Sequence, residues 1–499
     1  MSRHDRSWGE FQRRKVTRYL LFSLLIYSIS FEAISLFEWI LYPSVPNPDL
    51  FFAQTDFFVF KLLAPLSVIP LIVILYFSLG KIVLAHSGSL EARFPSPFRN
   101  LSRILADFRR LVPVSSQQAR LVITDHSRVL LVVTIAFGIL LVAIPYRPEL
   151  NPTTQPVGVD AHWYVEWVSQ MVRETPADAV SYAMGSASWG SRPLLLIPMY
   201  VTVSSGLVTI NGSVVALPFV LSPLLALSAF IFVREGTKNE KKASIAALFS
   251  MLSFTLAIGM WAGFYTNWLA ICEVYLFLAV LLRCSKLVTI QNLVLLTLGS
   301  LAILLTHPWT WLLVVSVSVV FALSLWKTNR NARPLLAVLV VLAICVSVDV
   351  AKMQLFGAST ATQDASLNLA HASTSDALGF WTNVIDSLFF LYSGLFANAV
   401  ILAFSLIAVL RLKMNNNFHR LLAAWLTVSS IPFAVLPALL QTRIIYDLPI
   451  PILTAMGTYL TATRLKTGTL EANLLLLLII LTVANYTIRV LTSIVTSPF

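Results

Sequence analysis

Apolar stretches long enough to cross a lipid bilayer recur along nearly the whole of this 499-residue chain. A hydrocarbon core of roughly 30 Å is crossed by about 20 helical residues. Because lipid offers the backbone no hydrogen-bond partner, a helix is the only open-ended structure that satisfies its own peptide groups there. The composition agrees, with 57% hydrophobic residues, 12% charged residues and a mean hydropathy of +0.80. The sequence therefore predicts an all-α polytopic membrane protein.

The hydropathy pattern predicts about 13 membrane-spanning helices. They cover residues 18–42, 57–85, 129–145, 213–233, 243–260, 268–284, 288–306, 309–326, 335–351, 387–410, 421–440, 449–463 and 471–493. One further apolar stretch, Pro193 to Ile210, contains two prolines and a Thr-Val-Ser-Ser-Gly run. It could cross the membrane or lie along its surface.

The basic residues decide between these two placements, because counting residues 193–210 as a span reverses the side of every later loop. If this stretch lies at the interface, 28 of the 35 Lys and Arg residues fall on one face. Basic residues gather on the cytoplasmic side of membrane proteins. We therefore expect an interfacial helix in the first large external loop, a cytoplasmic N-terminus and an extracytoplasmic C-terminus.

The same topology divides the chain into two parts. Residues 1–128 are predicted to form a transmembrane hairpin plus a basic cytoplasmic amphipathic loop, and residues 129–499 a transmembrane core. External loops at 146–192 and 352–386 belong to this core. The basic residues behind the formal charge of +12 are expected to face lipid headgroups and to set the orientation of the chain in the membrane. We expect membrane lipids as partners and no nucleic acid.

The external loop 146–192 contains an acid with unusual neighbours, in "VGVDAHWYVEWV" (157–168). Asp160 follows a turn rich in Pro and Gly and precedes residues with helical spacing, so we expect it at or near a helix N-terminus. It could be a helix cap or a functional acid. His162 and Glu166, four residues apart, could form an acid/base or metal pair or a solvated helix contact.

Two other predicted helix ends on the external side carry polar residues. His307 in "THPWTW" (306–311) could be a structural residue at the interface or line a polar pocket. Asp349 and Lys352 close another helix, and we expect Lys352 to be exposed at the interface.

A succession of short motifs then runs from the external acid to a second external turn. Asp160 is followed by "RPL" (192–194), the span at 213–233, a basic turn and "AGFY" (262–265). This order resembles the GT-C membrane glycosyltransferases, especially the catalytic subunit of oligosaccharyltransferase, and also the protein O-mannosyltransferases. In that family the first external loop carries an essential Asp and ends in an interfacial helix led by Pro-Leu. The resemblance covers residues 129–499.

The resemblance implies an enzyme that transfers a sugar from a polyprenyl (dolichyl) phosphate donor to a glycan, protein or lipid acceptor on the extracytoplasmic face. A single inverting displacement is expected, in which Asp160 accepts the proton of the acceptor. An external Arg in such enzymes holds the lipid phosphate, a role that falls to Arg443, although this residue could also snorkel to headgroups or pair with Asp447. The substrate-binding residues are expected to be Arg443, His162, Glu166, His307, Tyr446, Tyr265 and Asn267.

The second external turn departs from the family pattern. Oligosaccharyltransferase continues there with two acids that help to bind a divalent cation, whereas this chain has Thr266, Asn267 and Trp268. Hard cations take several oxygen ligands, so a divalent cation is possible but its acid pair is missing. The three cysteines have neither zinc nor disulfide spacing and are expected to be packing residues. We assign no metal ligand.

Two other classes of function stay open. A polytopic lipid or solute transporter is supported by the number of spans and by the intramembrane acids Glu32 and Asp349. A catalytically inactive GT-C-like scaffold is supported by the missing acid pair.

Overall fold

The computed structural model describes residues 76, 78–82, 121–149, 151–363, 395–435, 444–464, 469–492 and 494, and within them it is helical with no strand. The expected unit 1–128, the spans 18–42 and 57–85 and the loop 352–386 fall largely outside the described residues, as does Arg443. The prediction of an all-α chain is confirmed for the described part.

Seven helices among the described residues are long and apolar enough to cross a membrane. They are Ser127–Tyr146, Ile210–Thr237, Glu240–Ala262, Tyr265–Cys284, Pro308–Asn329, Arg333–Phe356 and Ala472–Thr492. This finding supports a multi-pass membrane protein, whereas the expected number of 13 spans stays a prediction. The helices that form the bundle are α4 (Ser127–Ala143), α8 (Ile210–Thr237), α9 (Glu240–Met251), α10 (Phe254–Ala262), α11 (Tyr265–Cys284), α12 (Ile290–Thr306), α13 (Pro308–Asn329), α14 (Arg333–Phe356), α17 (Leu395–Leu410), α18 (Asn417–Val435), α20 (Ile450–Arg464) and α21 (Thr469–Thr492).

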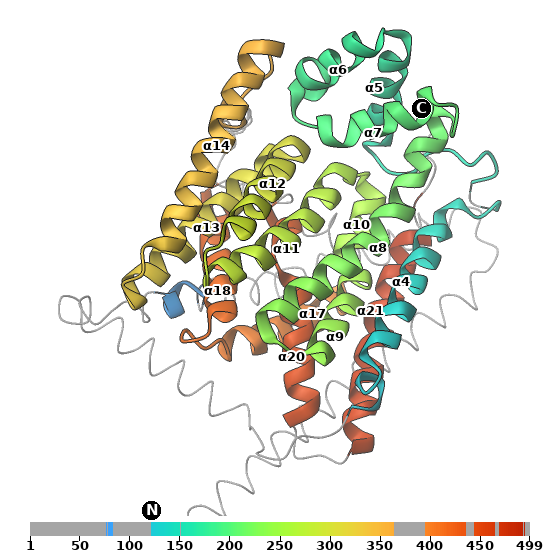
Figure 1. Ribbon diagram of the computed structural model, residues 1–499. Helices are drawn as coiled ribbons and strands as arrows, with labels where there is room; N and C mark the ends of the chain where they lie inside the picture. The colour runs from blue at the N-terminus through green and yellow to red at the C-terminus, as the bar shows by residue number, and fades with distance from the viewer. Residues whose placement is uncertain are drawn as a thin grey trace, which may run out of the picture.

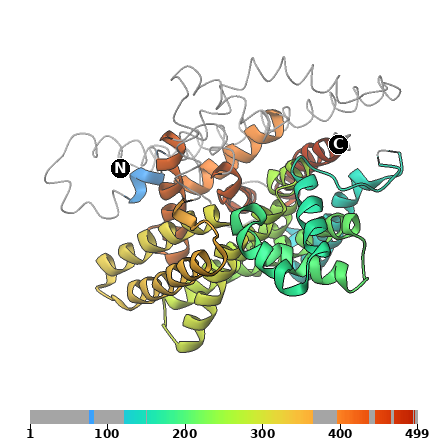
Figure 2. The ribbon, with the colours of Figure 1, turned by 90° about the horizontal axis from the view of Figure 1, so that it is seen from above.

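Three shorter helices gather at one end of this bundle (Figure 1). They are α5 (Ala161–Arg173), α6 (Pro176–Gly185) and α7 (Pro193–Ser204). Seen from above, most of α12, α13 and α14 extends away from these short helices (Figure 2), but α6 contacts α14 and α7 contacts α12. The chain therefore carries a cap of short helices over part of one end.

Contacts between distant segments show which helix ends lie together. One end of the bundle, which we call the basic end, carries the basic residues that follow α8 and end α11. There Lys241 Nζ lies 2.9 Å from Asp125 Oδ1, and Arg283 Nε lies 3.3 Å from Glu235 Oε2. At the opposite end, which we call the loop end, the Asp160 N–H donates to the Ala262 carbonyl at 2.9 Å. Asp125, the turn after α8 and the end of α11 therefore lie at one end of the bundle, and the segments around Asp160 and Ala262 lie together at the other.

The segment after Arg192 stays at the loop end. Helix α7 has 12 residues, which at 1.5 Å per residue span about 18 Å, too short for the hydrocarbon core. Beyond it, the Asn211 side chain at the start of α8 donates to Gln155 Oε1 at 3.1 Å, back in the loop that precedes α5. Both ends of the segment therefore lie at the same end of the bundle, and its placement at the membrane surface stays a prediction.

The predicted span 243–260 is two helices, α9 and α10, which meet at Ser253. The Ser253 hydroxyl accepts a hydrogen bond from the Thr255 N–H at 3.3 Å and so caps α10. Helix α9 packs against α8, α4 and α20, and its residues 243–251 are all buried, whereas seven of the 24 residues of α14 are buried. The α9 and α10 pair is the central element of the bundle, and small residues such as Ala246 and Ala247 allow close packing there.

Lys352 is buried, which corrects the expectation that it is exposed. Its side chain is 1% exposed, and Nζ lies 3.3 Å from Asp349 Oδ1 and 3.0 Å from the Gly190 carbonyl oxygen. The other Asp349 oxygen accepts from the Ala361 N–H at 2.8 Å. Lys352 is buried because the turn before α7, around Gly190, and the segment after α14, around Ala361, both fold over the C-terminal end of α14. There the ammonium stabilises a turn in which Ser188 and Trp189 have left-handed φ angles of 47° and 58°.

Candidate functional site

A narrow cavity at the loop end brings together side chains from four separate parts of the chain. It is lined by Asp160, Tyr164, Arg192, Phe264, Thr266, Asn267 and His307. Its empty volume is about 230 Å³, and it has room for about one ordered water between the side chains. Asp160, Asn267 and His307, which were predicted separately as site residues, therefore face the same space.

A close crossing of two glycines places Asp160 in this cavity. Gly158 has a φ of 104°, and a Cβ built on it would lie 2.6 Å from Gly263 Cα and from the Met260 carbonyl oxygen. Gly263 has a φ of 69° and ends α10. Two backbone hydrogen bonds extend this contact. The Val159 N–H donates to the Trp261 carbonyl at 3.2 Å, and the Asp160 N–H donates to the Ala262 carbonyl at 2.9 Å. Only glycine lets the two backbones approach this closely.

Asp160 occupies the N-cap position of α5, as the sequence predicts. Its side chain makes no capping hydrogen bond to the first turn of the helix. Asp160 is instead one of the residues that line the cavity.

Arg192 supplies the positive charge of the cavity, a role that the sequence did not assign to it. It is the N-cap residue of α7, and its Nη1 donates to the Tyr164 hydroxyl at 3.4 Å. The guanidinium lies 5.2 Å from the ring centre of Trp167 and 5.9 Å from that of Tyr164. Such stacking holds the planar group in one orientation. Its buried Nε has no hydrogen-bond partner among the described residues, so this guanidinium retains capacity for a ligand.

The Tyr164 hydroxyl links α5 to the start of α11. It lies 3.2 Å from Thr266 Oγ1 and accepts from the Thr266 N–H at 3.3 Å. Tyr164 is fully buried. These contacts fix the wall of the cavity between Arg192 and Asn267.

The opposite wall is a buried polar network around the Thr310 hydroxyl. Thr310 Oγ1 lies 2.8 Å from His307 Nδ1, 2.8 Å from Asp447 Oδ2 and 3.0 Å from Asn267 Oδ1. The Thr310 N–H also lies 3.3 Å from His307 Nδ1, in the geometry of a helix cap for α13. All four residues are at most 6% exposed. His307 is therefore held at the cavity by residues from three different segments.

The other predicted site residues lie elsewhere. His162 and Glu166 are exposed on α5, and neither lines the cavity. The Tyr265 hydroxyl donates to the Val157 carbonyl at 2.6 Å, so this side chain supports the segment that leads to Asp160. Burial raises the pKa of Tyr446 well above its usual value, and its hydroxyl donates to the Thr255 carbonyl at 2.7 Å. Both tyrosines pack inside the bundle, and Arg443 falls outside the described residues.

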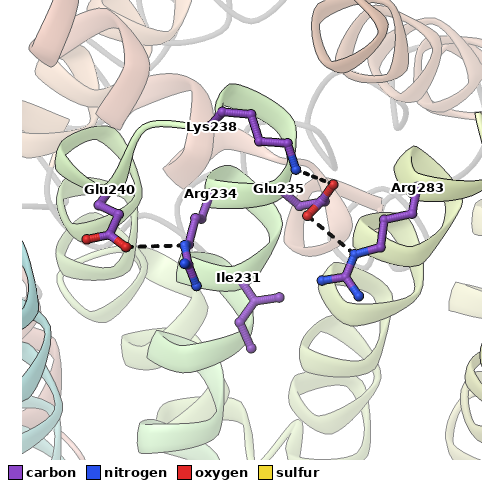
Figure 3. Close-up of a pocket in the computed structure, with 6 residues that line it drawn as sticks. All are labelled: Ile231, Arg234, Glu235, Lys238, Glu240 and Arg283. Atoms are coloured by element: carbon purple, nitrogen blue, oxygen red, sulfur yellow. Dashed lines mark hydrogen bonds and ion pairs between the residues drawn. The ribbon is translucent and has the colours of Figure 1, made fainter. Parts of the chain in front are cut away.

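A larger cavity lies at the basic end, with an empty volume of about 910 Å³ (Figure 3). It is lined by Ile231, Arg234, Glu235, Lys238, Glu240 and Arg283. Its charged side chains pair with one another, as Glu235 does with Lys238 and Arg283. The three basic side chains are about half exposed. These ion pairs tie α8, α9 and α11 together at a solvated surface.

The loop-end cavity offers one carboxylate, one guanidinium, one imidazole and one amide. Within the part of the chain that the structure describes, no group of three His, Cys, Asp or Glu side chains could hold a metal ion. These side chains can transfer a proton and bind an anion.

The fold defines the class of protein, a multi-pass α-helical membrane protein with a polar cavity at one end. Comparison with known proteins does not narrow this class, because neither a protein-family model nor a curated protein matches the chain. The resemblance to GT-C glycosyltransferases stays a prediction.

Proposed function

We propose that this chain is a membrane glycosyltransferase that transfers a sugar from a polyprenyl phosphate to an acceptor bound at the loop end. The observation that carries the proposal is that Asp160, Arg192 and His307 line one cavity although they are far apart in the sequence. The charge bias of the loops favours an extracytoplasmic position for this cavity. Membrane lipid around the bundle would receive the polyprenyl chain.

In the proposed reaction the acceptor oxygen or nitrogen attacks the anomeric carbon of the sugar. The bond from that carbon to the phosphate oxygen breaks, and the phosphate leaves with the electron pair. Asp160 takes the proton of the acceptor, and the configuration at the anomeric carbon inverts. Phosphate is a good leaving group, so no separate acid is required.

Arg192 is the described residue best suited to the leaving phosphate. A guanidinium binds phosphate through two parallel N–H groups, and a preorganised cation stabilises charge that develops during the reaction. The stacking on Trp167 and the contact with Tyr164 provide this preorganisation. Arg443 keeps the role that the family resemblance implies for it, as a second cation that would act on the same phosphate.

The test is transfer of labelled mannose or glucose from dolichyl phosphate by the purified protein in lipid nanodiscs. Asp160→Asn is expected to lower turnover by about 10²-fold to 10⁴-fold, the usual contribution of a general base. Asp178→Asn is the matched control, because Asp178 is an external acid of α6 that pairs with Thr175 and does not line the cavity.

Equal turnover in the wild type and Asp160→Asn would overturn the assignment of the base. Binding of the labelled donor without transfer would indicate the inactive scaffold, and flux of a lipid or solute into liposomes would indicate the transporter. Either result would replace the glycosyltransferase proposal.

A further inference from the structure

Each of the two acids at the basic-end cavity is shared by two cations. The ion pairs are Glu235 with Lys238 and Arg283, and Glu240 with Arg234 and Arg128. Two carboxylates therefore face four cations, which leaves an excess of two positive charges among these groups. An anion is the ligand that complements this excess.

The two arginines that line the cavity are oriented by their ion pairs and open to a further partner. Glu240 lies 3.4 Å from Arg234 Nε, and Glu235 lies 3.3 Å from Arg283 Nε. Figure 3 shows the outer nitrogens of both guanidinium groups on the side of these contacts where Ile231 lies. The two side chains are 56% and 48% exposed, so a ligand can reach these nitrogens.

The side where Ile231 lies is the membrane side of the cavity. Helix α8 runs from the loop end to the basic end, so Ile231, three residues before Arg234, lies about 4.5 Å nearer the middle of the bundle. Ile231, Leu227 and Val220 are 36%, 40% and 61% exposed, and their spacing of four and seven residues places them on one face of α8. A lipid chain lying along this face would bring its headgroup to the two guanidinium groups.

We propose that the basic-end cavity binds the phosphate of an anionic phospholipid, whose acyl chains lie along the exposed apolar face of α8. The outer N–H groups of Arg234 and Arg283 donate to the phosphate oxygens. Glu235 and Glu240 hold the two guanidinium groups in place through Nε. The cavity and Asp160 lie at opposite ends of the bundle, so this site is independent of the proposed reaction.

Charge favours an anionic lipid over a zwitterionic one. A phosphatidylglycerol headgroup brings one negative charge to the excess of positive charge, whereas a phosphatidylcholine headgroup adds a quaternary ammonium beside it. Anionic lipids also predominate in the cytoplasmic leaflet, the side that the charge bias of the loops predicts for this end.

Native mass spectrometry of the full-length protein in detergent measures the affinity for the first phospholipid bound. The probe is dioleoyl phosphatidylglycerol, and dioleoyl phosphatidylcholine, with the same acyl chains, is the control for binding by the chains alone. Phosphatidylglycerol is expected to bind at least about 10-fold more tightly, the usual effect of one hydrogen bond between charged groups.

Arg234→Gln and Arg283→Gln are each expected to weaken the binding of phosphatidylglycerol by about 10-fold. Both variants should fold, because exposed ion pairs contribute little to stability. Lys286→Gln is the matched control, since it removes an exposed positive charge three residues after Arg283 but does not line the cavity. It should leave the affinity unchanged, and a loss in either arginine variant beyond that of the control supports the site.

Three results would overturn the proposal: equal affinity for the two lipids, unchanged binding in both arginine variants, or an equal loss in Lys286→Gln. Inorganic phosphate separates a lipid phosphate from a free one. Displacement of phosphatidylglycerol by an equal concentration of inorganic phosphate would also overturn the lipid as the occupant of the cavity.

Discussion

The glycine crossing beside Asp160 makes a sharp prediction, because a single methyl group at Gly158 should disturb both stability and the cavity. A Cβ there would lie 2.6 Å from three backbone atoms of residues 260 and 263, about 0.8 Å short of the 3.4 Å at which ordinary contact begins. Backbone atoms cannot rotate away, so the segment must move by about that distance. Asp160 is two residues farther on and moves with it.

The expected magnitude has two parts. A residue other than glycine with a left-handed φ costs roughly 1–2 kcal/mol, and overpacking adds about 1–3 kcal/mol. Gly206→Ala is the matched control, since Gly206 has a φ of 71° but nothing lies within 4 Å of its added Cβ. Gly158→Ala should therefore lose roughly 1–3 kcal/mol more than Gly206→Ala. Gly263→Ala, with contacts at 3.0 Å, should fall between them.

The assay is unfolding in detergent followed by tryptophan fluorescence, together with sugar transfer in nanodiscs. A displacement of nearly 1 Å in a catalytic group costs about 10²-fold in rate, so Gly158→Ala should lose this much transfer while Gly206→Ala keeps it. Equal stability of these two variants would refute the steric argument. Unchanged transfer in Gly158→Ala would refute the link between the crossing and Asp160.

Two further predictions concern buried charge. Lys352→Met should lower the free energy of unfolding by about 3–5 kcal/mol, because it leaves the buried Asp349 carboxylate without its cation. Lys238→Met, which removes the cation of an exposed ion pair, should lower it by at most about 1 kcal/mol. Similar losses for the two variants in chemical unfolding would contradict this prediction. Burial and the charges of three nearby lysines lower the pKa of His419 to about 4 from 6.5. The unfolded chain then binds a proton before the folded one does, so stability should fall as the pH drops from about 6.5 to 4, by at most about 3 kcal/mol. In His419→Asn, which keeps an acceptor for the Lys413 N–H, this part of the pH dependence should be absent from melting curves.

Much of the fold follows from the hydropathy pattern. Helices α11 and α13 begin within three residues of their predicted starts, because lipid forces long apolar stretches to be helical. The break at Ser253 could not be predicted, since serine is also tolerated inside membrane helices, and only the packing of α9 and α10 decides which role it takes. The charges of the loops predict an interfacial position for residues 193–210, and this position stays a prediction.

The site could be predicted only in part. Asp160 and His307 stand out as polar residues at helix ends, and both line the cavity. Their meeting depends on the glycine crossing and on Thr310, contacts between segments that no local pattern encodes. Arg192 gave a weak signal, because it is the only basic residue between Arg173 and Arg234. Tyr446 and Tyr265 were predicted to bind substrate, but both are buried in the bundle, and an aromatic side chain gives the same local pattern whether it is buried or lines a site.

The enclosure of α9 has a consequence for how the protein is assembled during synthesis. Residues 243–251 of α9 are all buried, yet α20, one of the helices that covers α9, is synthesised about 200 residues later. Chains emerge from the ribosome N-terminal part first, so the Ala- and Ser-rich surface of α9 must face lipid or an insertion factor until α20 arrives. A nascent chain truncated before α20 would expose an open groove along its central helix, a surface that membrane quality control could recognise.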